Sequence, residues 1–158
     1  MHDTNLFKVV QARIGTLSTA GAQHAGDFVG TDHTPITFAD CARVNGGTGH
    51  IVSGLFLDGD LQSIAAELWL FNYPITSLGH DNAAFTVSDA EMVYCVGILP
   101  FSTYYAGALN SLSRGVPSAL IEFQCQENSR ALYGAFVTRG APTYTTAVPF
   151  FTLNIWQD

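Results

Sequence analysis

Short segments of alternating apolar and polar residues, separated by turn residues, are the feature of this sequence that most constrains its fold. The segments are rich in Val, Ile, Phe, Tyr and Trp, which favour strands, and Gly, Pro, Asn or Asp lie between them. No strand–helix–strand rhythm is present, so the pattern favours an antiparallel over a parallel sheet. We expect roughly eight strands, at 6–14, 36–44, 50–58, 61–72, 93–101, 118–126, 131–138 and 150–157.

The connections between these segments refine the fold class. Asp58-Gly59-Asp60 contains the Asp-Gly pair favoured in tight hairpins, and 127–130 is predicted to join a second hairpin. Ser88 and Glu91 have the spacing of a capping box, which predicts the start of a short helix. The sequence therefore predicts a mainly β fold, an antiparallel β-sandwich of jelly-roll type with one short helix. An immunoglobulin-like sandwich is the second choice.

The length of 158 residues suits one domain, but its beginning differs from the rest. Residues 15–35 are rich in Gly, Ala, Ser, Thr and His, which is typical of a long irregular segment. Long loops of this kind often contact a partner. We therefore expect 1–35 to form an extended N-terminal arm or loop segment and 36–158 to form the β-sandwich domain.

Charged residues make up only 12% of the chain, about half the usual share. Partner subunits that cover the surface would explain this, and so would a sandwich with polar, uncharged loops. The net charge of −7, the single lysine Lys8 and the scattered arginines argue against nucleic-acid binding. The sequence has no apolar run long enough for a membrane helix and no signal-peptide pattern, so we expect synthesis in the cytoplasm.

The sequence lacks the signatures of the common catalytic and metal sites. P-loop, dinucleotide-binding and nucleophile-elbow patterns are absent, and no two histidines have the spacing of metal ligands. Cys41, Cys95 and Cys125 form no C-x-x-C pair and are expected to be buried thiols. Glu67 and Glu122 lie in apolar strands, and nothing places them together as a glycosidase pair. We expect a structural or binding protein with no metal and no cofactor, not an enzyme.

Aromatic and cationic residues in the loop-rich parts are candidates for a binding surface. Tyr104 and Tyr105 lie in the segment 102–117, where they can pack in the core, anchor an interface or stack on a sugar. The residues selected as the candidate interface are Phe28, His33, Tyr104, Tyr105, Arg114 and Tyr144.

Several segments between 36 and 158 resemble a family of small virion proteins of tailed bacteriophages. They are ARVNGGTGHIVSG (42–54), AELWLFN (66–72), DNAAFTVSDAEM (81–92), VGILPF (96–101) and VTRGAPTY (137–144). The resemblance implies a capsid decoration, or cement, protein that binds the major capsid protein as a homotrimer at local three-fold positions. It implies no catalytic residues.

The resemblance also sets the expected location and its alternatives. We expect the protein on the capsid surface of the virion after assembly in the host cytoplasm, with capsid contacts made by 1–35 and by loops such as 102–117. The alternative is a tail, fibre or minor head component that binds a host glycan or another virion protein. A metal-dependent enzyme of the cupin type is a third class, which metal analysis of the purified protein would reveal.

Overall fold

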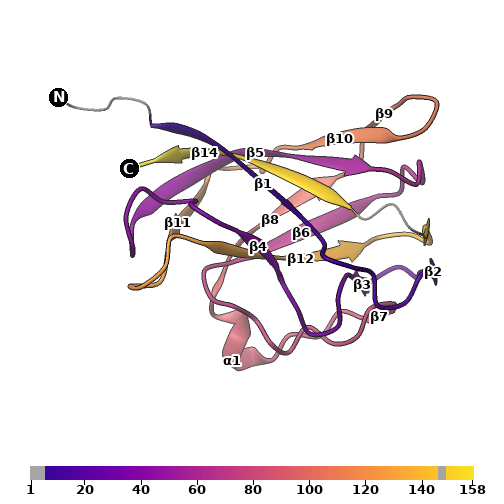
Figure 1. The fold of residues 1–158 in the computed structure, drawn as a ribbon, viewed down its shortest axis with the longest axis horizontal. Helices are drawn as coiled ribbons and strands as arrows, with labels where there is room; N and C mark the ends of the chain where they lie inside the picture. Colours follow the sequence, from indigo (N-terminus) through magenta and orange to yellow (C-terminus); the bar gives the residue numbers. More distant parts are fainter. Residues whose placement is uncertain (1–5, 146–148) are drawn as a thin grey trace.

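The computed structural model describes residues 6–145 and 149–158, which form two six-stranded antiparallel sheets packed face to face (Figure 1). This confirms an antiparallel β-sandwich with one short helix, while the jelly-roll connectivity stays a prediction. No helix in the described part of the chain is long and apolar enough to cross a membrane. The elements are β1 (Phe7–Arg13), β2 (Gly21–Ala22), β3 (Asp27–Val29), β4 (Ile36–Phe38), β5 (Thr48–Asp58), β6 (Ala66–Phe71), β7 (Ala83–Ala84), α1 (Asp89–Met92), β8 (Cys95–Phe101), β9 (Tyr104–Ala106), β10 (Ser111–Gly115), β11 (Ile121–Gln124), β12 (Leu132–Thr138), β13 (Thr143–Tyr144) and β14 (Phe150–Gln157).

The first sheet is built around β5, the longest strand. Its order is β1-β14-β5-β10-β9, and β11 also pairs with β5. β5 carries one extra residue, Val52, where its register with β14 shifts between Asn154 and Ile155. β11 pairs with β5 before this bulge and β10 pairs with it after the bulge. One long strand therefore brings three distant parts of the chain into one sheet.

The second sheet is built around β12 and has the order β7-β3-β12-β6-β8. β12 pairs with β6 along one edge and with β3 and β4 along the other. β13 and β2 form a separate two-stranded sheet.

A cluster of aromatic rings fills the space between the two sheets. Phe56 of β5 lies at its centre, with ring centroids 5.7 Å from Phe101, 4.8 Å from Phe136 and 5.2 Å from Phe151. All four side chains are buried. Aromatic pairs at these distances add about 0.5–1.5 kcal/mol each beyond the burial of their area, so this cluster holds the two sheets together.

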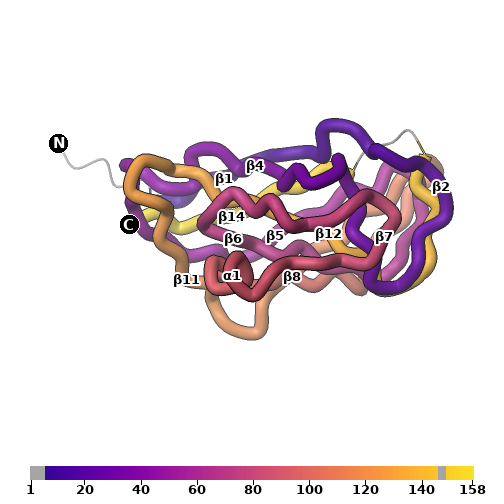
Figure 2. The backbone as a smooth tube through the Cα atoms, turned by 90° about the horizontal axis from the view of Figure 1, so that it is seen from below, coloured from indigo at the N-terminus to yellow at the C-terminus, as the bar shows by residue number. Residues whose placement is uncertain are grey.

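The chain itself covers the outer face of the second sheet. The segment 72–94, which includes β7 and α1, lies against this face, and in Figure 2 it passes in front of β6 and β12. Ile75 and Leu78 from this segment are buried against Phe71 of β6 and Ala135 of β12. A second apolar cluster therefore closes this side of the sandwich.

Helix α1 ties this covering segment together through a carboxylate. Ser88 is the N-cap, and its side chain accepts a hydrogen bond from the backbone N–H of Glu91, as the capping-box pattern predicted. The Glu91 carboxylate accepts hydrogen bonds from the backbone N–H groups of Thr76 (3.0 Å) and Ser77 (2.9 Å) and from both of their hydroxyls. Burial alone would raise the pKa of Glu91, but these hydrogen bonds outweigh it and lower the pKa to about 2.

We expect Glu91→Gln to loosen the covering segment and to lower the melting temperature by a few degrees at pH 7, because charge-assisted hydrogen bonds are lost. The contribution of Glu91 is fully present above its unfolded-state pKa of about 4.5 and is lost as the pH falls toward 2. The difference between wild type and variant, measured by thermal denaturation, should shrink over that range. Glu127→Gln, at an exposed acid outside this network, is the control, and an equal effect there would contradict the role of Glu91.

Neither predicted hairpin is present. β5 lies in the first sheet and β6 in the second, so the turn at Asp58-Gly59-Asp60 carries the chain between sheets. The Asp58 carboxylate accepts hydrogen bonds from the backbone N–H groups of Asp60 (3.1 Å) and Ser63 (2.7 Å). Leu61 and Ser63 have positive φ angles, and the strand begins only at Ala66. Likewise, β11 and β12 belong to different sheets.

The expectation of a separate N-terminal arm is wrong for the described part of 1–35. β1 pairs with β14 over seven residues, from Phe7 opposite Trp156 to Arg13 opposite Phe150. β3 pairs with β12 in the second sheet. This segment therefore supplies strands to both sheets, and the sandwich extends beyond 36–158. Residues 1–5, the beginning of the expected arm, lie outside the described residues.

Candidate functional site

The outer face of the first sheet carries side chains aligned in rows across the strands. The register places one residue from each of five strands in the first row, which is Arg13, Phe150, Leu57, Leu112 and Tyr105. At the other end of the sheet, a second row contains Phe7, Trp156, His50 and Glu122. Side chains directly opposite one another on paired strands point to the same face, so both rows lie on one surface. We call this surface the outer face.

Apolar side chains lie at both ends of the outer face, with Gln11, Thr152 and Asn154 between the two rows, and no other described part of the chain covers this face. Tyr105 is 74% exposed and Trp156 is 50% exposed, and Phe7, Val9 and Leu112 are also exposed. With strands about 4.8 Å apart and a rise of about 3.4 Å per residue, the rows span roughly 20 Å in each direction. An area of this size is comparable to the largest apolar patch of a typical monomer, and such patches are often binding sites. By contrast, the outward side of the second sheet is covered by residues 72–94 of the same chain.

The cations on the outer face lie within this apolar area. The Arg13 guanidinium lies over the ring of Phe150, with Cζ 5.7 Å from the ring centroid. Arg114 lies opposite Leu55 in the register of β10 and β5. Among the described residues neither arginine forms an ion pair, whereas Arg130 pairs with Asp40 and Arg139 with Glu67. Arginine in an apolar surround is a typical anchor of protein interfaces.

A groove of about 310 Å³ lies at the Trp156 end of the outer face. Leu6, Val52, Leu120 and Trp156 provide most of its wall, and His50 lies at its polar end. Phe7 packs edge-on against Trp156, with ring centroids 6.1 Å apart, and this contact helps to hold the indole in place. The groove can accept an apolar side chain from a partner.

Two of the six predicted interface residues lie on the outer face, Tyr105 of β9 and Arg114 of β10. Tyr104 points to the other side of β9, packs against the core and donates a hydrogen bond to the carbonyl oxygen of Ile64 at 2.5 Å. Its burial raises its pKa above the ordinary value. Phe28 and Tyr144 are each 1% exposed, so predicting them as interface residues was wrong. Both pack within the protein's own apolar clusters.

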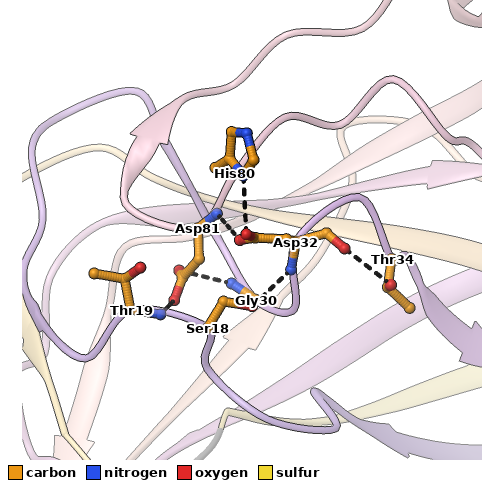
Figure 3. A network of polar contacts seen from close by, with 7 residues as sticks. All are labelled: Ser18, Thr19, Gly30, Asp32, Thr34, His80 and Asp81. Carbon is orange, nitrogen blue, oxygen red and sulfur yellow. Dashed lines mark hydrogen bonds and ion pairs between the residues drawn. The ribbon is translucent and has the colours of Figure 1, made fainter.

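His33, the sixth residue, lies in a polar network away from the outer face. Its ring contacts that of His80 edge-on, with centroids 4.6 Å apart. His80 Nδ1 lies 2.8 Å from the Asp32 carboxylate, which also accepts a hydrogen bond from the backbone N–H of Asp81 at 2.7 Å (Figure 3). The hydrogen bonds from His80 and Asp81 hold the pKa of Asp32 below its ordinary value.

The same network continues through Asp81. Its carboxylate accepts hydrogen bonds from the backbone N–H groups of Thr19 (2.7 Å) and Gly30 (3.0 Å) (Figure 3). Burial raises the pKa of Asp81 above its ordinary value. These bonds fasten the loop that precedes β4 to the segment that covers the second sheet. The network is explained by this structural role.

The side chains weighed for chemistry do not converge on a catalytic centre. Burial raises the pKa of Cys41 to about 12 and that of Cys125 to about 11, which disfavours the nucleophilic thiolate. Glu67 lies in the second sheet, where Arg139 Nη2 binds it at 2.6 Å and lowers its pKa, whereas Glu122 lies in the first sheet. Within 6–145 and 149–158, no group of three or more His, Cys, Asp or Glu side chains is placed to hold a metal ion.

Comparison with known proteins gives no family for this chain. No protein-family model matches it, and no curated protein matches its sequence. Function is therefore argued from the outer face itself.

Proposed function

We propose that this protein is a non-enzymatic structural subunit of a bacteriophage virion, a capsid decoration protein that stabilises capsomer contacts. The observation that carries the proposal is the exposed apolar outer face of the first sheet, which is the binding surface. Its main anchors are Leu112, Tyr105 and Trp156, and Arg114 of β10 and Arg13 of the edge strand β1 lie on the same face.

A binding surface of this size suits a protein that attaches to a shell with many identical sites. A footprint of roughly 20 Å by 20 Å is smaller than the roughly 800 Å² per partner of a standard stable interface. One copy alone would bind weakly, but copies linked as an oligomer bind with the affinity of several sites at once. A repeated shell offers identical sites at symmetric positions, so many modest contacts add up.

The resemblance to small virion proteins supplies the proposed partners, the major capsid protein and further copies of this chain. We propose a homotrimer on the capsid surface. Light scattering on the purified protein tests the oligomeric state: a mass near three times 17.0 kDa supports the trimer, and a strict monomer contradicts it.

The decoration function itself is tested by co-sedimentation with empty, expanded shells of the phage whose genome carries this sequence. We expect saturable binding with a fixed number of copies per shell and increased resistance of the shells to heat. Binding to isolated tails or fibres, with none to shells, would overturn the proposal and favour the tail or minor head alternative.

A further inference from the structure

A polar trench lies beside β11. Figure 1 shows this strand at the end of the sandwich where the C-terminus lies. The trench consists of two hollows of about 450 Å³ and about 470 Å³, and Gln124 lines both. His50 and Glu122 lie in the first hollow, and Asn72 and Gln126 lie in the second. The first hollow shares His50 and Asp158 with the apolar groove beside Trp156, so the groove adjoins it.

The backbone around the trench is held in place by a turn that requires glycine. Gly46 has a φ angle of +69°, and a Cβ atom at this position would lie 3.4 Å from the Cα atom of Glu127. Gln124 Nε2 donates a hydrogen bond to the carbonyl oxygen of Gly46 at 3.2 Å. The wall that contains Gln124 is therefore formed before any ligand binds.

Carboxamide groups in the trench are only partly satisfied by the protein. Asn72 Nδ2 donates a hydrogen bond to the carbonyl oxygen of Gln124 at 2.9 Å. Asn72 Oδ1 is buried and has no hydrogen-bond partner among the described residues. A buried acceptor without a donor is unfavourable. A ligand hydroxyl or a bridging water would donate the missing hydrogen bond to it.

The charges around the trench exclude an anionic ligand. Glu122, Glu127 and Asp158 line it, and His50 is the only basic side chain among its lining residues. His50 already lies between two carboxylates, with Nε2 3.8 Å from Glu122 and Nδ1 3.7 Å from Asp158. The trench therefore offers hydrogen-bond acceptors, carboxamide donors and little positive charge.

We propose that the trench binds a neutral oligosaccharide. Sugar hydroxyls both donate and accept hydrogen bonds, as carboxamides do, and they donate well to carboxylates. The adjoining hollows give room for more than one sugar ring, and the exposed indole of Trp156 in the adjoining groove offers a flat apolar surface. This binding function goes beyond attachment to a shell. It shares Trp156 and the second row with the outer face, but Gln124 and Asn72, which supply its carboxamides, lie outside both rows.

The probe is an array of neutral and sialylated oligosaccharides, followed by calorimetric titration of the strongest neutral binder. We expect Gln124→Ala to weaken binding of that oligosaccharide about ten-fold, because the variant loses hydrogen bonds to the sugar and leaves their partners unpaired. Glu122→Ala should have a similar effect. Gln11→Ala, an exposed glutamine on the opposite edge strand of the same sheet, is the matched control and should bind like wild type.

Three results would overturn this proposal. They are the absence of any neutral binder on the array, binding of sialylated glycans only, and an affinity of Gln124→Ala for the oligosaccharide equal to that of wild type. A peptide array gives a fourth such test. A peptide that binds wild type but not Gln124→Ala would show that the ligand of the trench is a protein segment. A variant such as Leu112→Asp, which is expected to lose shell binding, should keep oligosaccharide binding, so failure of one proposal is distinguishable from failure of the other.

Discussion

Deleting residues 1–35 is expected to leave a chain that does not fold. The deletion removes β1, which pairs with β14 over seven residues, and β3, which pairs with β12. It also removes the buried side chains of Val10, Ile14, Phe28 and Val29. Each buried side chain contributes about 1.5–3 kcal/mol to the free energy of unfolding, so the deletion lowers it by roughly 6–12 kcal/mol. A domain of this size is stable by only about 5–15 kcal/mol, so the remaining chain should be unfolded or aggregated.

Circular dichroism in the near-ultraviolet and a two-dimensional NMR spectrum of the truncated chain check this prediction. Adding a synthetic peptide of residues 1–35 in excess should restore the native spectrum, since the missing strands pair with β14 and β12. A truncated protein that unfolds cooperatively and shows native chemical-shift dispersion would contradict the role given to β1 and β3.

A single acidic substitution on the outer face is expected to abolish attachment to the shell while leaving the fold intact. Leu112 is exposed on β10 and lies opposite Leu57 and Tyr105 in the first row. In Leu112→Asp, docking would bury a carboxylate against apolar groups, at a cost of several kcal/mol. We expect the affinity for shells to fall by about 100-fold or more, as at interface hot spots. Trp156→Asp should act in the same direction from the other end of the face.

Thr37→Asp is the matched control for these variants. Thr37 is exposed on β4 of the second sheet, so this substitution adds the same charge to a strand that is not part of the outer face. It should bind shells like wild type in the sedimentation assay. If Leu112→Asp sediments with shells as wild type does, and its melting temperature is unchanged, the outer face is not the docking surface.

Local sequence patterns predicted the strands better than their partners. The segments around β1, β5, β6, β8, β11, β12 and β14 were all recognised, because β-branched and aromatic residues concentrate in them. Which strands pair with one another was not predicted, because pairing depends on contacts between distant parts of the chain. Asp58-Gly59-Asp60 has the composition of a hairpin turn, yet the Asp58 side chain binds the backbone of Ser63 and directs the chain to the other sheet.

The first 35 residues illustrate the same limit. Their glycines, threonines and histidines resemble those of a free loop, but Asp32, His80 and Asp81 fix this loop by hydrogen bonds to residues about 50 positions away. No local pattern contains that information. The N-cap at Ser88 was predicted correctly because its contact with the Glu91 N–H spans only three residues. The Glu91 carboxylate, however, binds Thr76 and Ser77 instead of the Ser88 N–H, so the capping box is not completed.

The candidate site was only partly predictable. Tyr105 and Arg114 were selected from the sequence, but Phe7, Trp156 and Leu112 were not. Phe7 and Trp156 lie inside predicted strands, and Leu112 lies in 102–117, which was predicted as a loop. A signal was present in 150–157, where Phe150 and Trp156 fall on one face of the strand while Phe151, Leu153 and Ile155 fall on the other. Large aromatic side chains at both ends of the outward side, with Thr152 and Asn154 between them, indicate that this side is also partly covered. No described part of the chain covers the outward side of β14, so we expect a partner to cover it.

The most direct test of the docking surface is a cryo-electron-microscopy map of empty shells incubated with the wild-type protein. We expect density for the sandwich with β1, β14, β5 and β10 facing the shell, so that Leu112 and Trp156 contact the capsid protein. A map in which this face points to solvent, with the segment 72–94 against the shell, would contradict it.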